Sequence, residues 1–208
     1  MADIVGQDLK YIRLNDKDLI GRCMEIGFFE GGNLTKASEL LLGKKDGVEL
    51  DIGANMGSFT IPLAFYNPQF DFVCFEPQRM VYYQLCGNVA LNKLKNVDVH
   101  NIGLADKAYI FVTPVPDYDN EENIGAFSLD NEVRNHDDYL CKTTSFRQTM
   151  EIEMLDSYTF DDVRLIKIDV EGMELEVLKG AVLTIQAHDY PPIMFEAWRS
   201  EEHTSELQ

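Results

Sequence analysis

The 208-residue sequence lacks long apolar runs and an amino-terminal targeting pattern. No stretch approaches the roughly 18 to 20 uninterrupted apolar residues that cross a bilayer. Residues 1–3 do not begin a basic segment followed by an apolar one, the arrangement of a secretory leader. These absences exclude membrane proteins and secreted proteins from the expected classes, and we expect a cytoplasmic protein without a membrane partner.

Basic residues and cysteines are also scarce. The chain has 18 Lys and Arg against 36 Asp and Glu, which gives a formal net charge of −18. An acidic surface of this kind repels a phosphate backbone, so nucleic acid is not an expected partner; it favours solubility or, alternatively, attracts cationic partners. The four cysteines form no CxxC pair, so neither a disulfide framework nor a zinc cage is expected. Cys74 lies in an apolar run and is expected to be a buried thiol.

The sequence does contain the alternating pattern of an α/β domain. Hydrophobic residues make up 45% of the chain, which is enough for a core. Predicted strands cover 48–52, 70–75, 97–102, 165–170 and 193–195, and predicted helices cover 58–66, 78–94 and 174–184. Strands that alternate with helices predict a Rossmann-like α/β fold with a doubly wound, mainly parallel sheet in a single domain, residues 47–198.

Three segments lie outside this alternation. Residues 1–46 contain a short strand or turn at 11–14 and a helical spacing of apolar residues before Gly43, so we expect a helical cover of the same domain. Residues 108–150 combine an extra strand at 109–112 with acidic loops, and a segment of that length predicts an insertion that covers a ligand. Residues 199–208 are polar and are interpreted as a non-native tail, outside the fold.

The strongest motif is the glycine-rich turn after the first predicted strand, from Asp51 to Gly57 (DIGANMG). Glycines at 53 and 57 permit a sharp turn and close approach of a ligand, and free amides at the following helix N-terminus would face that ligand. The turn lacks the GxGxxG spacing of a dinucleotide site. Asp51 suits the ammonium, or a linked water, of an amino-acid-bearing cofactor such as S-adenosylmethionine. The structural alternative is a helix-capping loop without a ligand.

A second candidate is Glu76, at the end of the second predicted strand. An acid at that place in an open α/β sheet can accept hydrogen bonds from both hydroxyls of an unphosphorylated ribose. Taken alone, a glutamate there is as well explained as a surface charge. Its pairing with the glycine-rich turn favours the ribose interpretation.

The segment 166–174 (IKIDVEGME) brings Lys167, Asp169 and Glu171 to the end of a third strand. Strand alternation puts the three side chains on one face if the strand extends that far. We expect Asp169 and Glu171 to orient or deprotonate an acceptor. The alternative is an ion pair of Lys167 with one carboxylate and an acid at a helix N-terminus. Glu196, which ends the next strand, is a further candidate for the same pocket.

Other chemistry is not expected. Acids at neighbouring strand ends raise the question of a divalent cation, because hard cations prefer oxygen ligands, but we expect no metal. The histidines show neither HExxH nor another ligand spacing and are expected in loops or at the surface: His100, His136, His188 and His203. No Ser/His/Asp or Cys/His nucleophile set can be placed.

Together these motifs resemble the FkbM family of S-adenosylmethionine-dependent methyltransferases. The resemblance rests on segments 51–57 (DIGANMG), 75–77 (FEP), 101–106 (NIGLAD) and 166–180 (IKIDVEGMELEVLKG) and covers roughly residues 45–197. It implies a class I methyltransferase fold and O-methylation of a hydroxyl on a sugar, glycan or secondary metabolite. By position it implies that the turn holds the methionine part of the cofactor, through Asp51, Gly53, Ala54, Asn55 and Gly57. It further implies that Glu76 holds the ribose and that the segment beginning Gly103-Leu104 lies near the adenine.

One departure from the family pattern leaves alternatives open. A class I sheet usually closes with a further helix and an antiparallel strand pair, and residues after Glu196 do not show that pattern. A shortened chain would keep its cofactor site while losing part of its acceptor site. The alternatives to a methyltransferase are therefore a protein that binds S-adenosylmethionine without turnover and a nucleotide-dependent oxidoreductase. The sequence leaves the oligomeric state open.

Overall fold

A computed structural model describes residues 2–5, 9–12, 31–119, 128 and 142–195, with only the backbone described for 2–5. The strands are β1 (Ala2–Val5), β2 (Leu9–Ile12), β3 (Gly47–Ile52), β4 (Phe70–Phe75), β5 (Val97–His100), β6 (Gly103–Leu104), β7 (Tyr109–Pro116), β8 (Thr143–Glu153), β9 (Val163–Ile168) and β10 (Ile193–Phe195). The helices are α2 (Gly31–Leu41), α3 (Thr60–Tyr66), α4 (Arg79–Leu91), α6 (Glu174–Lys179) and α7 (Val182–Ala187), with a 3₁₀ turn at Leu155–Ser157.

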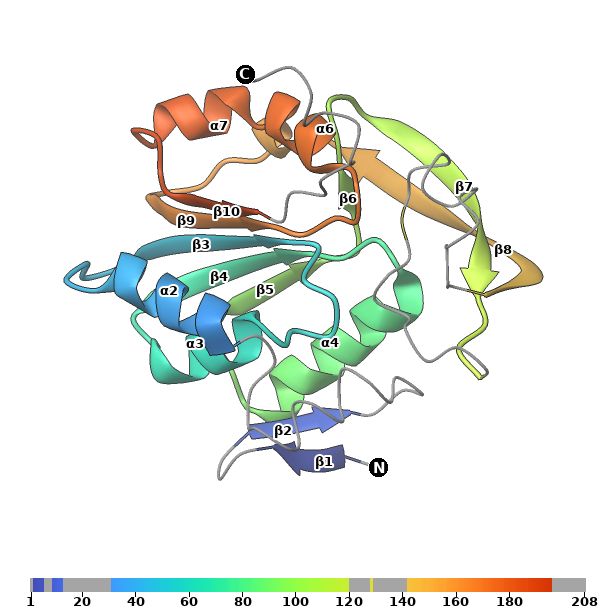
Figure 1. The fold of residues 1–208 in the computed structure, drawn as a ribbon, viewed down its shortest axis with the longest axis horizontal. Coiled ribbons are helices and arrows are strands. Elements are labelled where there is room, and N and C mark those ends of the chain that lie inside the picture. The colour runs from blue at the N-terminus through green and yellow to red at the C-terminus, as the bar shows by residue number, and fades with distance from the viewer. Residues whose placement is uncertain (1, 6–8, 13–30, 120–127, 129–141, 196–208) are drawn as a thin grey trace, which may run out of the picture.

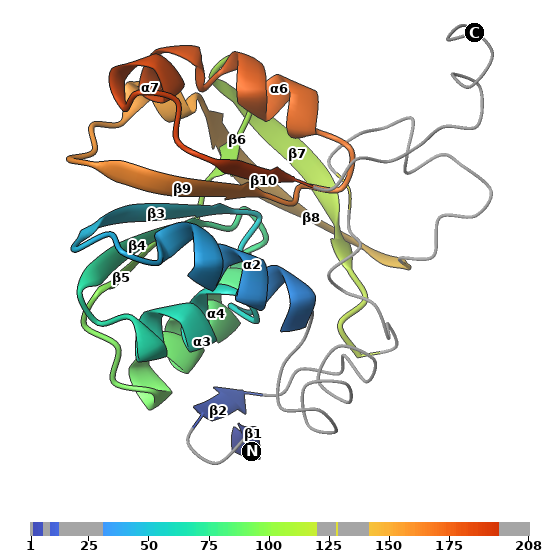
Figure 2. The ribbon, with the colours of Figure 1, turned by 60° about the vertical axis from the view of Figure 1, so that its left-hand side comes forward.

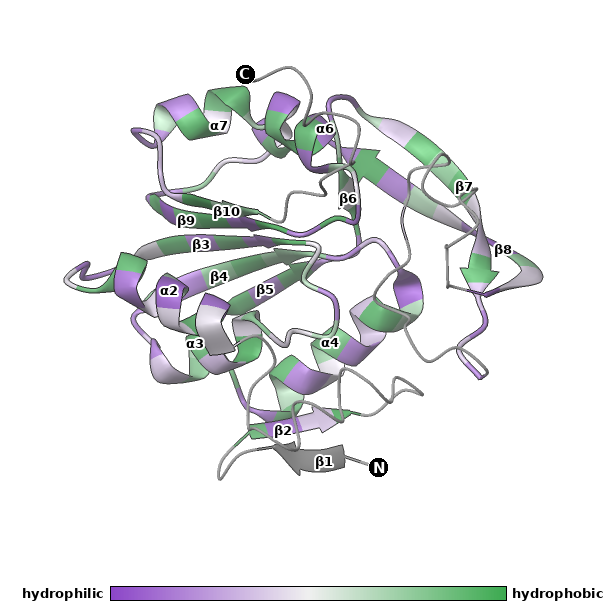
Figure 3. Cartoon of the chain, in the orientation of Figure 1, coloured by the Kyte–Doolittle hydropathy of each residue, from purple (hydrophilic) through white to green (hydrophobic). Residues whose placement is uncertain are grey.

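The main sheet has five strands in the order β10-β9-β3-β4-β5, and every neighbouring pair is parallel. Helices α2, α3 and α4 lie on one side of this sheet, and α6 and α7 lie on the other (Figures 1 and 2). Parallel strands covered on both faces are expected to be largely apolar, and Figure 3 shows mostly hydrophobic residues in the centre of the sheet, interrupted by a few hydrophilic ones. The doubly wound α/β fold is thus confirmed.

Strand β3 contributes to two separate layers of packing. Val48, Leu50 and Ile52 pack in a core cluster that includes Val177 of α6. The opposite face of the sheet packs in a second cluster with residues of α2 and α3. Because side chains alternate along a strand, Glu49 and Asp51 share that second face, where both are fully buried. Two carboxyl groups, two residues apart on the central strand, therefore lie next to each other in the interior.

A smaller sheet and a hairpin complete the fold. Strands β6, β8 and β7 form a three-stranded sheet, in which β7 and β8 are antiparallel. This sheet lies beyond the end toward which β3 and β4 run (Figure 1). The β1–β2 hairpin lies against α4. None of the helices in the described ranges combines the length and the apolar character needed to span a bilayer.

Several predicted boundaries are wrong in detail. The expected helix 174–184 is two short helices, since Gly180 breaks it; a Cβ there would lie 2.0 Å from the carbonyl oxygen of Ala105. The 108–150 segment contains β8, an 11-residue strand that was not predicted, as well as an extended β7. The β1–β2 pairing was also missed. Whether residues 1–46, 108–150 and 199–208 are a cover, an insertion and a tail stays a prediction.

Candidate functional site

The glycine-rich turn connects β3 to α3 and requires glycine at two positions. Gly53 has a φ of 79°, and a Cβ there would lie 1.8 Å from the carbonyl oxygen of Asp169. Gly57 has a φ of 88°, and a Cβ there would lie 2.6 Å from the Leu85 side chain. Asn55 also has a positive φ, 50°. The turn consequently packs backbone to backbone against the segment that follows β9.

The amides of this turn are bound within the protein. Gly53 and Ala54 N–H donate to the carbonyl of Phe75, at 3.0 and 3.1 Å. Asn55 N–H donates to Glu76. The remaining two bonds run from Met56 N–H to the Asn55 side chain and from Gly57 N–H to Ala54. These bonds fix the shape of the turn, and the prediction of free amides concerns the N-terminus of the following helix, which they do not test.

Glu76 follows β4 and is 4% exposed. Its Oε2 accepts a 3.0 Å bond from Asn55 N–H and its Oε1 a 2.8 Å bond from Gln78 N–H. The Asn101 side-chain amide donates to the Glu76 carbonyl at 2.9 Å and holds the loop in place. Each carboxylate oxygen keeps a second lone pair for a hydroxyl donor. Burial raises the pKa of Glu76 to about 7, against the two backbone hydrogen bonds, and the charge of Asp51 adds to the increase.

Lys167 of β9 joins two carboxylates. Its ammonium lies 3.2 Å from Asp51 Oδ1 and 3.2 Å from Asp169 Oδ2. The other oxygen of Asp51 accepts a 2.6 Å bond from the Thr60 hydroxyl. The ammonium also lies 3.4 Å from the carbonyl of Gly53, so it connects β9 to the glycine-rich turn. Asp51 is thus fully engaged inside the protein, whereas the Asp169 side chain is 33% exposed.

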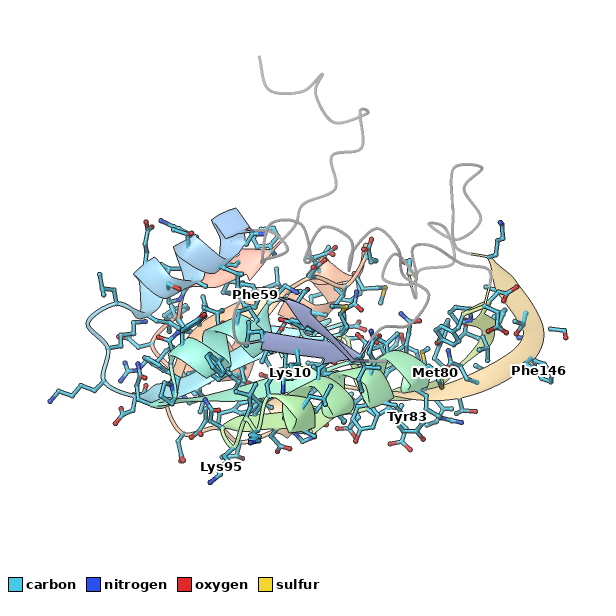
Figure 4. All side chains as sticks on the ribbon, turned by 90° about the horizontal axis from the view of Figure 1, so that it is seen from below. Lys10, Phe59, Met80, Tyr83, Lys95 and Phe146 are labelled. Atoms are coloured by element: carbon cyan, nitrogen blue, oxygen red, sulfur yellow. The ribbon has the colours of Figure 1, made fainter. Side chains whose placement is uncertain are left out.

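The pKa of Lys167 reflects this pairing. Burial acts to lower it, but the charges of Asp51 and Asp169 outweigh burial and raise the pKa above the usual value of a lysine. Lys167 also lies over the ring of Phe59, 5.5 Å from its centroid, and Figure 4 labels this ring. The side chain is therefore a permanent cation that cannot act as a base. The ion pair of Lys167 with one carboxylate of its own segment, given as the alternative, is present at Asp169, and Lys167 pairs with Asp51 in addition.

Glu171 does not continue the row of Lys167 and Asp169. Strand β9 ends at Ile168, and Glu171 has a φ of 53°, so the expected alternation does not reach it. Its carbonyl accepts a 2.5 Å bond from the hydroxyl of buried Ser128. The prediction that all three side chains share a strand face is therefore wrong for Glu171. Glu196, another predicted candidate, lies outside the described residues.

The family-derived positions Gly103 and Leu104 form β6 and pair with β8. Leu104 is 4% exposed and packs with Ile52 and Phe75 in the core, so its side chain belongs to the interior. His100, expected in a loop or at the surface, instead ends β5, and its ring stacks on Phe75 with centroids 5.1 Å apart. The two rings thus lie at the ends of β4 and β5, next to Glu76, which follows β4.

Sequence reasoning missed a second buried acid in this region. Glu49 is fully buried, and neither of its carboxyl oxygens has a hydrogen-bond partner among the described residues. Burial raises its pKa well above the usual value, and the charge of Asp51 acts in the same direction. The thiol of Cys74, buried as expected, donates to Thr60 at 3.3 Å. Across the described ranges, no group of three or more His, Cys, Asp or Glu side chains is arranged to hold a metal ion.

Comparison with known proteins identifies the family. The methyltransferase FkbM domain matches residues 51–204. Methyltransferase 1 of Beauveria bassiana (strain ARSEF 2860) is 27% identical over 146 residues, 65% of this chain and 58% of that protein. Methyltransferase sdnD of Sordaria araneosa is 31% identical over 160 residues, 63% of this chain and 59% of that protein. The chain thus spans less than two thirds of either relative.

A solved structure supports the fold. The crystal structure of methyltransferase FkbM from Methylobacillus flagellatus KT superposes with a TM-score of 0.50 at 19% identity, over 90% of this chain and 38% of that chain. The expected class I, Rossmann-like methyltransferase fold is confirmed. The resemblance drawn from the four sequence motifs is confirmed as well. The chain belongs to the FkbM family of S-adenosylmethionine-dependent methyltransferases.

Proposed function

We propose that this protein transfers the methyl group of S-adenosylmethionine to a hydroxyl oxygen of a sugar, glycan or secondary metabolite. The observation that carries the proposal is the convergence of three features at one edge of the parallel sheet. The strained turn follows β3, Glu76 follows β4, and the Lys167–Asp169 pair ends β9. The carboxyl edge of an open parallel sheet is where such folds bind ligands.

The residues present fit S-adenosylmethionine. Glu76 retains acceptor capacity for two ribose hydroxyls after its two backbone bonds are counted. The turn residues Gly53, Ala54, Asn55 and Gly57 would hold the methionine part through the shape of the backbone, because their amides are already bonded. Of Gly103 and Leu104, we assign only the backbone to the adenine, since the Leu104 side chain is buried.

The two aspartates take different roles in this proposal. Asp51 acts through Lys167, because Thr60 and Lys167 occupy its two oxygens. Asp169, one third exposed and held by the same ammonium, is the side chain that can reach a ligand. Lys167 is accordingly a positioning residue, and Asp169 is the first candidate for the general base. Glu171 is the second candidate, on a turn of different geometry.

Bound S-adenosylmethionine supplies an electrophilic methyl group on a sulfonium. Most of the rate enhancement in such a displacement comes from holding the acceptor oxygen in line. Asp169 would accept the proton that the hydroxyl loses, directly or through a water molecule. General-base assistance of this kind contributes about 10²- to 10⁴-fold to the rate. The fixed Lys167–Asp169 contact orients the carboxylate without the loss of side-chain freedom that an isolated residue would undergo.

The test is calorimetric titration with S-adenosylmethionine and S-adenosylhomocysteine, with NAD as the comparison ligand, followed by methyl transfer to a panel of sugars and hydroxylated metabolites. Binding of both sulfur ligands and methylation of an acceptor hydroxyl are expected. Binding with no transfer to any acceptor would favour a protein that holds the cofactor without turnover. Binding of NAD alone would refute the proposal.

A further inference from the structure

Three amide side chains, two on α4 and one at its C-cap, hold strand β2 against the domain. Asn92 accepts a 2.8 Å bond from Lys10 N–H and donates a 2.7 Å bond to the Lys10 carbonyl. Asn88 accepts a 2.6 Å bond from Ile12 N–H, and Gln84 donates a 2.8 Å bond to the Ile12 carbonyl. Figure 4 labels Lys10 where the hairpin lies over α4. We call Gln84, Asn88 and Asn92 the amide row.

The amide row matches the strand because two periods coincide. Residues four apart on a helix rise by about 6 Å, and residues two apart on a strand by about 6.8 Å. In an antiparallel pair, alternate residues direct their N–H and C=O groups to the same side. Strand β1 pairs with β2 on one side, and the backbone groups of Lys10 and Ile12 meet the amide row. The row therefore satisfies a strand edge that would otherwise be unpaired.

Asn88 does more than hold the strand. It is fully buried, and its amide donates a 2.8 Å bond to the carbonyl of Met56, inside the glycine-rich turn. Gln84 contacts the same residue weakly, with its amide nitrogen 3.8 Å from the Met56 sulfur. The Asn92 side chain instead bonds to Lys10 and to the Asn88 carbonyl. One end of the Asn88 side chain thus binds β2 and the other binds the turn.

Packing reinforces this link. Met56 is 1% exposed and packs in one cluster with Leu9 and Tyr11 of β2 and with Ile61 of α3. Met56 follows Asn55, the residue with positive φ, whose own N–H donates to Glu76. A change in the position of the Met56 carbonyl would therefore be transmitted to the backbone that donates to Glu76.

We infer that Asn88 is a positioning residue for the cofactor turn and that it couples strand β2 to cofactor binding, an inference that rests on the proposed function. The Asn88 donor fixes the Met56 carbonyl, and the Asn88 acceptor ties that same side chain to the amino-terminal hairpin. Undocking of the hairpin would release one of the two contacts that orient the side chain. Cofactor affinity would then depend on a segment more than forty residues away from the turn in sequence.

The chain offers matched variants. Asn88→Ala removes both contacts, whereas Asn88→Asp keeps the acceptor for Ile12 N–H and loses the donor to Met56. Asn92→Ala removes two bonds to β2 and leaves the Met56 contact intact. Affinity for S-adenosylhomocysteine is measured by calorimetry at 15 °C on samples shown to be folded by circular dichroism. Exchange of the Ile12 and Gly57 amides, followed by NMR without ligand, reports hairpin docking and turn order independently of binding.

We expect Asn88→Ala and Asn88→Asp to bind S-adenosylhomocysteine about fivefold to tenfold more weakly than wild type, the effect of one lost hydrogen bond at the site. The Gly57 amide should exchange faster in both, and Asn92→Ala should bind within twofold of wild type. Unchanged affinity in both Asn88 variants would overturn the inference, as would an equal loss in Asn92→Ala while its Ile12 amide exchanges as slowly as in wild type. If folded wild-type protein binds no ligand, the proposed function fails, and Gly57 exchange alone decides whether Asn88 orders the turn.

Discussion

Replacing Glu49 by Met should stabilise the protein, and increasingly so as pH rises. Glu49 is fully buried with both carboxyl oxygens unpaired, and each such orphaned polar atom costs about 1–3 kcal/mol. Methionine has a similar length and removes both oxygens. We therefore expect a net gain of about 1–3 kcal/mol in the free energy of unfolding. Imperfect packing of the methionine side chain offsets part of the stabilisation that the removal of both oxygens provides.

The pH dependence gives the sharper test. The pKa of Glu49 is raised in the folded protein, so the folded state binds its proton more tightly than the unfolded state does. The stability that this proton provides is present at low pH and is lost as pH rises from the unfolded pKa toward the folded one. The loss is about 1.4 kcal/mol for each pH unit in that interval. Glu49→Met lacks this titration, so its advantage over wild type should grow by that amount per unit.

Urea unfolding of wild type, Glu49→Met and Glu49→Gln at pH 5.5, 6.5 and 7.5 measures these differences. Glu49→Gln is the matched control, because it cannot ionise but keeps polar atoms in the same apolar surroundings. It should show the same pH-dependent advantage as Glu49→Met with a smaller constant gain. An advantage that does not change with pH, or a loss of stability in both variants, would refute the reasoning.

Three further predictions concern the site itself. The pKa of Glu76 is about 7, and the ionised carboxylate is the better acceptor for ribose hydroxyls, so affinity for S-adenosylhomocysteine should rise about tenfold between pH 6 and pH 8. The Glu76→Gln variant should bind weakly and show no such rise. An affinity of the wild type that does not change with pH would contradict this role. Asp169→Asn should lower kcat about 10²-fold or more and leave cofactor affinity within threefold of wild type. Asp51→Asn should weaken cofactor affinity and lower the melting temperature, since it leaves Lys167 with one carboxylate partner. Single-turnover rates and calorimetry distinguish the two effects, and the same defects in both variants would refute the separate roles of the two aspartates. Gly53→Ala should cost more than about 2 kcal/mol of stability by urea unfolding, because its φ is positive and the added Cβ meets the Asp169 carbonyl; a near-neutral result would show that the turn is not held as described.

The sheet, and the places in it of the turn glycines and of Glu76, could be predicted because their signals are local. Strand β4 runs from Phe70 to Phe75 as its apolar pattern predicts, and the short strand β10 also matches. Glycines at positions of positive φ and an acid at a strand end are likewise visible in the residues themselves. Strand β8 was missed because its inward residues include Gln148 between polar neighbours, which hides the period of two. The end of β9 was set too late because an apolar run does not show where Gly172 turns the chain.

Contacts between distant segments could not be read in the same way. The amide row has a sequence signal, since Gln84, Asn88 and Asn92 recur at steps of four on a helix that is otherwise apolar on that face. The amide row does not reveal which segment it binds, because strand β2 lies 72 to 82 residues earlier in the sequence. The contacts of the Asp51 carboxylate likewise depend on Thr60 and on the register between β3 and β9, which the sequence does not show. The sequence therefore singled out Asp51 but did not show that Thr60 and Lys167 contact its two carboxylate oxygens.

Strand register decides which buried carboxyl group of β3 lies beside a cation. On β3, Glu49 and Asp51 share one face, and both are removed from water. Asp51 lies opposite Lys167 on β9, whereas Glu49 lies opposite Leu165. A buried carboxyl group is less costly beside a compensating cation: Asp51 has Lys167 at 3.2 Å, whereas burial raises the pKa of Glu49 and favours its protonated form. A shift of β9 by two residues that placed Lys167 opposite Glu49 would exchange the two roles, and it would move Lys167 and Asp169 together away from the edge of the sheet. The register that leaves Glu49 buried without a cation thus also brings Lys167 to the edge where the methyl acceptor is proposed to bind. There, Lys167 orients the carboxylate of Asp169.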